Sequence, residues 1–297
     1  MSDDSIQVPD QWKNLRVETW EGSILLFGPV DAGKSTFGRY LFHRLLETHK
    51  TAAYLDADLG QQTIGPPATL GLALRDNAPG DSVEDKSFPP GGRHLHRFVG
   101  SNTPRGHFLP LLLGMHKLQL AAMEKGATAI VINTSGFINP MHGAAVLKWA
   151  MVELLKPTRV VAFPQEREME PILAPLRRLM GSSLCLLTPA PGIVIRTDED
   201  RKSFRSQQYQ AYFQDAQVVG LSYKHLAVFP NRTFYPGQLL GLDGAAGYTM
   251  ALGIIEKIDI DEQALWIRTP WWGNGKVTTL RLGSLKLDNE SYLDESI

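Results

Sequence analysis

The feature that most constrains the fold is the segment GPVDAGKST, residues 28–36, which follows the apolar run ILLF and precedes a stretch of helical periodicity. Gly28, Gly33, Lys34 and Ser35 match the pattern G-x-x-x-x-G-K-[ST]. The two glycines allow such a loop to close around a phosphate, and the helix after it directs its positive dipole end at the same anion. In this pattern the lysine reaches the β- and γ-phosphates, and the serine hydroxyl binds Mg²⁺. A chance glycine-rich turn is the alternative, but the strand and helix on either side favour a site for a nucleoside triphosphate.

The segment from residue 24 to residue 187 continues this strand and helix order, because short β-rich apolar runs alternate with longer stretches of helical periodicity. Such alternation predicts the α/β class, with a doubly wound, mostly parallel P-loop sheet covered by helices on both faces. The expected strands are 24–27, 51–55, 96–99, 129–132, 159–163 and 184–187, and the expected helices are 35–49, 107–125, 143–155 and 166–180.

Two segments differ from this pattern. Residues 77–93 are rich in glycine, proline and charge, which indicates a surface loop before the third expected strand. From Gln217 onward, short alternating strands are broken by Gly, Pro and Asn, which are the turn signals of a small antiparallel β module. We therefore expect a phosphate-loop domain over residues 1–216 and a small C-terminal β domain over residues 217–297.

The composition narrows the class of protein. With 30 basic and 31 acidic side chains among 297 residues, the net charge of -1 argues against a protein that coats nucleic acid by bulk electrostatics, although it leaves a local basic site open. The single cysteine, Cys185, excludes a disulfide framework within the chain, and we expect it in the core. The N-terminal segment lacks the pattern of a secretory leader, and the apolar runs fall short of the roughly 18 residues of a membrane helix. These observations predict a cytoplasmic protein without a membrane partner.

Two carboxylates follow the second expected strand. In YLDADLGQQ, Asp56 and Asp58 stand at the carboxyl edge of the sheet, where the phosphate loop also lies. A carboxylate there can bind the metal, directly or through water, or accept the proton of an attacking hydroxyl. One of the pair is enough for this chemistry, and a turn cap before Gly60 is the alternative for both. The fourth expected strand ends in Asn133 and Thr134 instead of an aspartate; they either orient a water or a phosphate oxygen or satisfy their own backbone.

Three arginines, Arg196, Arg201 and Arg205, follow the last strand of the expected sheet. If Asp198 caps a helix, Arg201 and Arg205 lie one turn apart on the same face. Guanidinium groups suit the negative charge of a transferring phosphoryl group, which makes segment 190–214 a candidate lid helix. Composition alone favours the other interpretation, a solvated helix whose arginines pair with the acidic residues next to them.

Taken together, these segments resemble the polynucleotide 5′-hydroxyl kinase family, which includes the eukaryotic pre-mRNA cleavage-factor kinase, the pre-ribosomal-RNA processing kinase and archaeal and bacterial relatives. The resemblance extends over about residues 22–290. It rests on GPVDAGKST with its acidic Asp31, DADLGQ, GSNTP, NTSGF, QER at 165–167, and PGIVIR with the arginines after it.

The resemblance implies a role for each matching residue, with Asp58 as the catalytic aspartate and Phe137 as the aromatic clamp for a base. The implied catalytic residues are Lys34, Asp58, Arg196, Arg201 and Arg205. The implied nucleotide-binding residues are Gly28, Asp31, Ala32, Gly33, Lys34, Ser35, Thr36 and Gln165. The implied acceptor-binding residues are Gln61, Thr103 and Phe137, and the implied metal ligands are Ser35 and Asp58.

The sequence departs from the family in two respects. Eukaryotic members have an N-terminal β domain before the phosphate loop, whereas about 22 residues precede the first strand here, so their adenine contacts are not carried over. Phe137 replaces a tryptophan, which keeps a stacking face but loses area and the indole donor.

The resemblance implies an enzyme that uses ATP and Mg²⁺ to phosphorylate the 5′-hydroxyl ends of RNA or DNA. Two alternatives remain open: an ATP-binding scaffold of a nucleic-acid processing complex that transfers no phosphate, and a small-molecule kinase on the same fold. The sequence indicates no particular protein partner.

Overall fold

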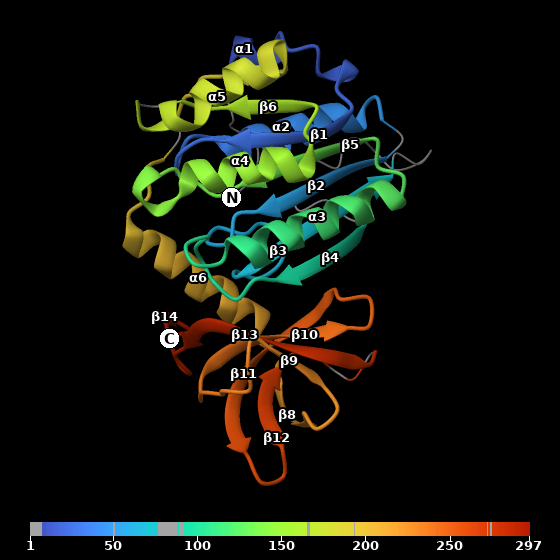
Figure 1. The fold of residues 1–297 in the computed structure, drawn as a ribbon, viewed down its shortest axis with the longest axis vertical. Helices are drawn as coiled ribbons and strands as arrows, with labels where there is room; N and C mark the ends of the chain where they lie inside the picture. Colours follow the sequence, from blue (N-terminus) through green and yellow to red (C-terminus); the bar gives the residue numbers. More distant parts are fainter. Residues whose placement is uncertain are drawn as a thin grey trace. The chain divides into compact units, whose positions relative to one another are not determined.

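The computed structural model describes residues 8–49, 51–76, 88, 92–164, 167–192, 194–271, 273 and 275–297. The internal contacts of the chain divide it into two units, which are described separately below (Figure 1). Unit 1 contains Met1–Asp58, Gly71–His94 and Thr103–Arg196, and unit 2 contains Leu59–Leu70, Leu95–Asn102 and Thr197–Ile297.

The first sheet has seven strands in the order β4-β3-β2-β5-β1-β6-β7. Its strands are β1 (Gly22–Phe27), β2 (Thr51–Ala57), β3 (Thr69–Asp76), β4 (Arg93–Phe98), β5 (Ala129–Thr134), β6 (Arg159–Ala162) and β7 (Leu184–Leu186). β1 pairs in parallel with β5 and β6, β5 with β2, and β6 with β7, whereas β3 runs antiparallel to β2. The predicted α/β class with a mostly parallel sheet is therefore confirmed.

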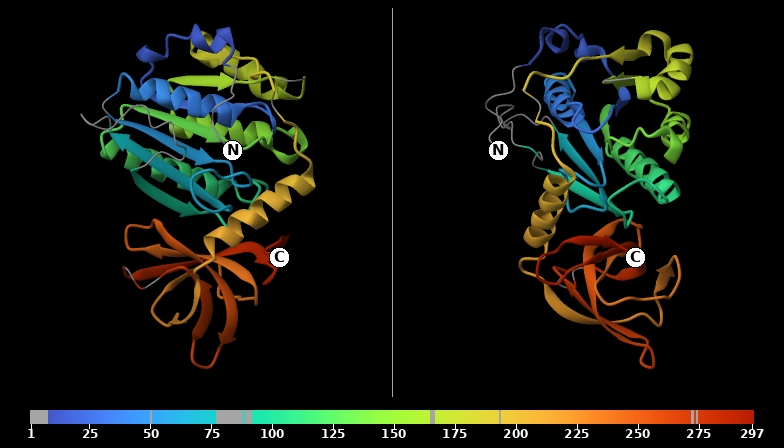
Figure 2. Two further views of the ribbon diagram at one scale, coloured as in Figure 1. Left: turned by 180° about the vertical axis from the view of Figure 1, so that it is seen from behind. Right: turned by 90° about the vertical axis from the view of Figure 1, so that its left-hand side faces the viewer.

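Helices cover both faces of this sheet, because its central strands are apolar on both sides. The helices are α1 (Asp10–Lys13), α2 (Lys34–Leu46), α3 (Phe108–Glu124), α4 (Ala144–Leu155) and α5 (Glu170–Met180), with 3-10 turns η1 (Val17–Thr19), η2 (Pro140–His142), η3 (Arg167–Met169) and η4 (Gly181–Ser183). The right-hand view of Figure 2 shows α2 on one face and α3 and α4 on the other. β2 and β5 are buried along their whole length, which is typical of strands covered on both sides. None of the described helices is long and apolar enough to cross a membrane.

Every expected strand of this sheet is present, but β3 was not predicted from the sequence. Its residues, TLGLALRD, are rich in glycine, alanine and leucine, which have little intrinsic preference for strands. Pairing with β2 over six residues stabilises this strand in the structure. α5 begins at Glu170, four residues later than expected, with a proline in its first turn where the missing N–H costs nothing. Most of the expected loop at 77–93 lies outside the described residues.

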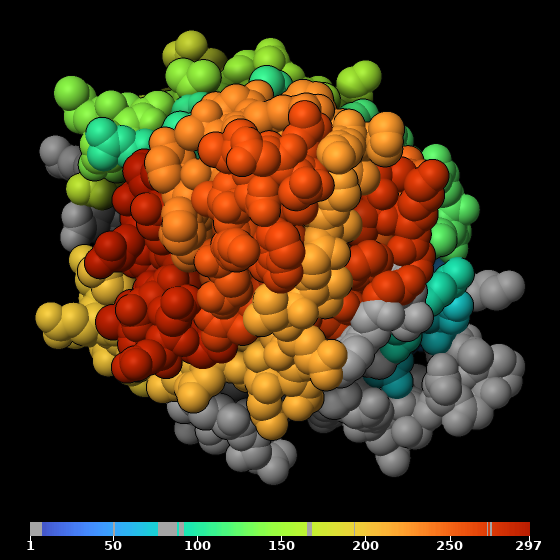
Figure 3. Space-filling model, turned by 90° about the horizontal axis from the view of Figure 1, so that it is seen from below, coloured from blue at the N-terminus to red at the C-terminus, as the bar shows by residue number. Residues whose placement is uncertain are grey.

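The second sheet is the small β module expected from Gln217, where β8 begins. Its strands are β8 (Gln217–Ser222), β9 (Ala227–Phe229), β10 (Gln238–Gly244), β11 (Thr249–Asp259), β12 (Ala264–Thr269), β13 (Val277–Leu287) and β14 (Asp294–Ser296). They follow the order β14-β13-β10-β11-β12-β8 with antiparallel pairing, and β9 adds a parallel pair with β13. Figure 3 shows a face formed mostly by side chains of these strands, in orange and red.

The helix α6 (Asp198–Tyr212) belongs to unit 2. Tyr209 and Phe213 share a hydrophobic core with Leu239 and Leu252 of the C-terminal strands. The hydroxyl of Tyr212 also accepts a 2.9 Å hydrogen bond from the Leu252 backbone. The helix at the end of the expected lid segment therefore packs on the β module.

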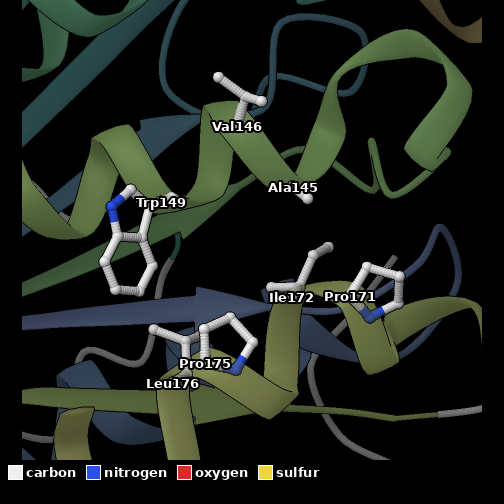
Figure 4. A pocket seen from close by; sticks show the side chains of 7 residues that line it. All are labelled: Ala145, Val146, Trp149, Pro171, Ile172, Pro175 and Leu176. Carbon is white, nitrogen blue, oxygen red and sulfur yellow. The ribbon is translucent and has the colours of Figure 1, made fainter. Parts of the chain in front are cut away.

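A pocket of about 320 Å³ lies between α4 and α5 (Figure 4). It is lined by apolar side chains of both helices: Ala145, Val146, Trp149, Pro171, Ile172, Pro175 and Leu176. None of the expected site residues that the structure describes lines it.

Candidate active site

The phosphate loop connects β1 to α2, as expected. Gly33 caps α2 with a left-handed backbone (φ +80°), and Asp31 also has a positive φ of +53°. At Gly28 a Cβ atom would lie 3.1 Å from the Cβ of Phe163, a close approach that favours glycine. The loop therefore ends at a helix N-terminus, whose unpaired N–H groups and dipole favour an anion. Within it Ala32 is fully buried.

Lys34 is the first residue of α2, and only 5% of its surface is exposed. Its ammonium group donates a 2.5 Å hydrogen bond to the carbonyl oxygen of Pro29 in the same loop. Burial lowers the pKa of Lys34 to about 8, and the carboxylates of Asp58 and Asp31 act in the opposite direction. A phosphate in the loop would favour the charged form further. The loop thus contains a buried cation within electrostatic range of two carboxylates.

Asn133 links α2 to β2 at the end of β5. Its amide nitrogen Nδ2 donates hydrogen bonds of 3.1 Å to Ser35 Oγ and to Asp56 Oδ1. Asp56 is fully buried and lies beside Asn133 in the paired strands β2 and β5. The Oδ1 atom of Asn133 is also buried and has no hydrogen-bond partner among the described residues. Ser35, Asn133 and Asp56 thus form one cluster of oxygen-bearing side chains beside the phosphate loop; Thr36, next to Ser35, is half-buried.

Asp58 follows β2 and is half-buried, unlike Asp56. Its backbone N–H donates a 3.1 Å hydrogen bond to Asp56 Oδ1. Its carboxylate raises the pKa of Lys34 against the effect of burial. The resemblance implies Ser35 and Asp58 as metal ligands. The structure places Asp56 at the same edge of the sheet, connected to Ser35 through Asn133. Both aspartates of DADLGQ therefore belong to this edge of the sheet.

The residues at this edge suit Mg²⁺. A serine hydroxyl, two carboxylates and an amide oxygen are the hard oxygen ligands that Mg²⁺ prefers, and the buried Asn133 Oδ1 lacks a protein partner within the described chain. Groups of three or more His, Cys, Asp or Glu side chains that could hold a metal are not found in the described residues. The site therefore fits an ion that takes one or two carboxylates together with the phosphates of a nucleotide.

Asp31 fastens the start of the expected lid to the phosphate loop. Its Oδ2 atom accepts a 3.0 Å hydrogen bond from the backbone N–H of Arg196. Arg196 is thus the expected lid arginine that the structure brings to the loop within unit 1.

The expected acceptor-binding residues of unit 1 lie near the start of α3. The ring of Phe137 meets that of Phe108 edge-on, with centroids 5.9 Å apart and planes at 70°. Phe137 is half-buried, so part of its ring remains accessible. Thr103 is exposed in the loop before α3, and its hydroxyl accepts a 3.4 Å hydrogen bond from the Arg105 backbone. Gln61, also half-buried, belongs to unit 2, and Gln165 lies outside the described residues.

The remaining lid arginines have different environments within unit 2. Arg201 pairs with Asp198 at 2.8 Å, and the side chain of Asp198 is 93% exposed. Arg205 is buried and makes two 3.0 Å hydrogen bonds to Asp294, which is also buried. The exposed Asp198 partner of Arg201 agrees with the solvated helix that composition favoured, whereas the buried Arg205–Asp294 pair does not.

The N-cap of α6 is Thr197 and not Asp198. Thr197 Oγ1 accepts a hydrogen bond from the Asp200 N–H, and the Asp200 carboxylate accepts one from the Thr197 N–H, which forms a capping box. Asp198 is thereby left at the first helical position, where it pairs with Arg201.

The different surroundings of the Arg201 and Arg205 ion pairs predict unequal effects of their removal on stability. Arg205→Ala would leave the buried Asp294 carboxylate without its cation and should lower the free energy of unfolding by about 3 kcal/mol. Arg201→Ala removes a pair whose carboxylate, on Asp198, is 93% exposed, and should cost about 1 kcal/mol or less. Urea unfolding of both variants measures this difference, and equal stabilities would contradict it.

Lys148 is a residue of this region that the sequence analysis missed. It lies on α4 with 1% of its surface exposed, and its Nζ donates hydrogen bonds to Thr134 Oγ1 (2.8 Å) and to the Ser135 carbonyl oxygen (3.0 Å). The helical period could have indicated it, because Lys148 follows Ala144 by four residues and precedes Met151 by three on the buried face of α4.

The profile of the family described as mRNA cleavage and polyadenylation factor CLP1 P-loop matches residues 28–215. A polyribonucleotide 5′-hydroxyl-kinase of Pyrococcus furiosus is 31% identical over 206 residues, which cover 69% of this chain and 54% of the relative. A polyribonucleotide 5′-hydroxyl-kinase of Methanocaldococcus jannaschii is 28% identical over 73% of this chain and 57% of its own length.

Solved structures agree on the fold. A chain of the wild-type Clp1p–Pcf11p complex matches 93% of this chain and 77% of its own, with a TM-score of 0.66 and 12% identity. The two curated kinases are matched over little more than half of their length.

Proposed function

Because the chain belongs to the CLP1 P-loop family, we propose that it transfers the γ-phosphoryl group of ATP to the 5′-hydroxyl end of RNA or DNA. The observation that carries this proposal is the cluster at the edge of the first sheet. There the buried Lys34 lies within electrostatic range of Asp58, and Asn133 joins Ser35 to Asp56. Such a site has the cation, the carboxylates and the helix N-terminus that phosphoryl transfer needs.

Each residue has a proposed role in this reaction. Lys34 leaves the Pro29 carbonyl and binds the transferring phosphate, while the loop that contains Gly28, Ala32, Gly33 and Thr36 surrounds the remaining phosphates. Asp58 accepts the proton of the attacking 5′-hydroxyl, since it is the more accessible of the two carboxylates.

Ser35, Asp56, Asn133 and Asp58 are the residues that would hold Mg²⁺. When bound, this ion neutralises negative charge on the β- and γ-phosphates. Asp56 and Asn133 also fix each other and the Ser35 hydroxyl through the hydrogen bonds described above.

The residues proposed to contact the acceptor and to form the lid come from the resemblance to the polynucleotide 5′-hydroxyl kinase family. Phe137 would stack on a base, Thr103 and Gln61 would contact the acceptor, and Gln165 would contact the nucleotide. Arg201 is a better candidate for direct phosphate contact than Arg205, because the Asp198 that pairs with it is 93% exposed, whereas both partners of the Arg205–Asp294 pair are buried. Arg196 is a candidate because Asp31 holds its backbone beside the phosphate loop. Residues 190–214 as a lid, the division at residue 217 and a cytoplasmic location remain predictions.

Asp31→Ala tests the hydrogen bond that holds Arg196. Loss of a bond to a charged acceptor should lower kcat about tenfold, because the start of the lid would no longer be fixed beside the phosphates. Asp31→Asn retains an acceptor oxygen and tolerates a positive φ, so it should recover most of the rate. Steady-state kinetics with ATP and an oligonucleotide measure both variants. Equal impairment of the two would assign the effect to the charge of Asp31 instead.

The proposed reaction is tested with γ-labelled ATP, Mg²⁺ and RNA and DNA oligonucleotides of one sequence that carry a 5′-hydroxyl. Label should appear on the 5′ end, and a 5′-phosphorylated oligonucleotide serves as the control that accepts none. ATP binding without transfer would favour the scaffold. Transfer to a small-molecule acceptor that oligonucleotides do not compete with would favour the small-molecule kinase.

A further inference from the structure

Lys148 is a buried cation that the proposed reaction does not use. Its hydrogen-bond acceptors are the neutral oxygens of Thr134 and Ser135, and its ammonium lies 4.9 Å from the centroid of the Phe27 ring. Phe27 is the last residue of β1 before the phosphate loop, and Thr134 is the last residue of β5. Lys148 therefore connects α4 to the ends of the two central strands of the sheet.

Thr134 continues this connection to β1. Its hydroxyl accepts from Lys148 at 2.8 Å and donates to the carbonyl oxygen of Leu26 at 2.7 Å. The Thr134 hydroxyl is the acceptor in the first bond and the donor in the second. Donation from Lys148 therefore directs the hydroxyl hydrogen toward the Leu26 carbonyl. The ammonium thus orients a hydrogen bond that ties β5 to β1 just before the phosphate loop starts.

The turn after Thr134 touches the phosphate loop directly. A Cβ atom at Gly136 would lie 2.7 Å from the Cα of Val30, so the two backbones are in close contact. The next residue is Phe137, the proposed base clamp. Through Ser135, Lys148 holds the short segment that lies between the phosphate loop and this aromatic ring.

Stability does not explain a lysine at this position. Burial lowers the pKa of Lys148 to about 7, the charge of Lys34 acts in the same direction, and Asp58 opposes both. An apolar side chain of similar length would avoid the cost of burying a cation among neutral partners, as Leu147 and Met151 do on the same helix.

We infer that Lys148 is a positioning residue of the nucleotide site, which acts through Thr134 and Ser135 to fix the turn that supports the phosphate loop and presents Phe137. This inference rests on the proposed function of the site. It concerns the binding of ATP more directly than the transfer step, since Lys148 reaches the loop through the Gly136–Val30 contact.

The test compares Lys148→Met, Thr134→Val, the double variant, and Lys156→Met as a control for an exposed lysine at the end of the same helix. ATP dissociation constants are measured by calorimetry in the presence of Mg²⁺, alongside melting temperatures. Lys148→Met should weaken ATP binding about tenfold and Thr134→Val by about threefold or more, with melting temperatures within a few degrees of wild type. The control should bind ATP as wild type does.

The double variant decides whether Lys148 acts through Thr134. If it does, the double variant should bind ATP about as weakly as Lys148→Met, whereas independent effects would multiply and would overturn the inference. Wild-type ATP affinity in Lys148→Met would overturn it as well. If Lys148→Met does not fold, Thr134→Val alone decides, because it keeps the size of the side chain. If the wild-type protein binds ATP but transfers no phosphate to the 5′ end, the proposed function is refuted. The comparison of ATP dissociation constants among the variants would still test the role of Lys148.

Discussion

Phosphoryl transfer by Lys34→Ala is expected to fall at least about 100-fold, because the substitution deletes the charge aimed at the phosphate that moves. The structure adds that Lys34 is buried with a pKa lowered to about 8, so its ammonium does not stabilise the fold at neutral pH. Single-turnover measurements with labelled ATP would detect the loss. Lys125→Ala, which removes an exposed lysine at the end of α3, is the matched control and should retain full activity.

The free energy of unfolding, measured as a function of pH, shows both that Lys34→Ala is folded and that the titration of Lys34 is gone. Between pH 8 and 10.5 the unfolded chain binds more protons at Lys34 than the native protein does, so the wild-type free energy of unfolding should rise with pH in this range. In Lys34→Ala this rise should become smaller. Near-wild-type turnover by a variant with the smaller rise would show that the loop is not the catalytic site.

Asp58→Asn is expected to lower transfer by at least about 100-fold while ATP affinity stays within a few fold, because the amide keeps the shape of the side chain and loses its basicity. Asp56→Asn should reduce the rate less, by roughly tenfold, because Ser35, Asn133 and Asp58 would remain to hold Mg²⁺. It should also lower stability, because Oδ1 would accept the hydrogen bonds from Asn133 and the Asp58 backbone without the negative charge that strengthens them in this fully buried position.

Rate and stability together distinguish the two aspartates. Pre-steady-state transfer, ATP titration and urea unfolding would be measured on both variants, with Asp76→Asn, on the exposed end of β3, as the control. A greater loss of rate in Asp56→Asn than in Asp58→Asn would reverse the assigned roles.

The sequence predicted those parts of the molecule that local patterns determine. The phosphate loop, the expected strands of the first sheet and the start of the β module at Gln217 follow from motif spacing, hydrophobic period and turn residues. β3 could not be predicted in this way, because its stability comes from pairing with β2 and not from its own composition.

Contacts between distant residues were outside the reach of such patterns. Arg205 and Asp294 are 89 residues apart, and nothing near either of them indicates that they form a buried pair. Lys148 is different, since its place on the apolar face of α4 is visible in the sequence. Its hydrogen bonds to the end of β5 nevertheless depend on how the helix packs.

The register of β2 beside β5 has a consequence for protein engineering. Asp56 faces Asn133 because these residues are partners in a parallel pair, and neighbouring residues of a strand point to opposite faces. A graft of GPVDAGKST onto another scaffold would therefore carry the phosphate loop without the Asp56 carboxylate. The smallest portable unit comprises β1, the loop, the first turn of α2, and the strands β5 and β2 in their native alignment. A shift of β2 by a single residue would turn Asp56 away from Asn133, which links it to Ser35.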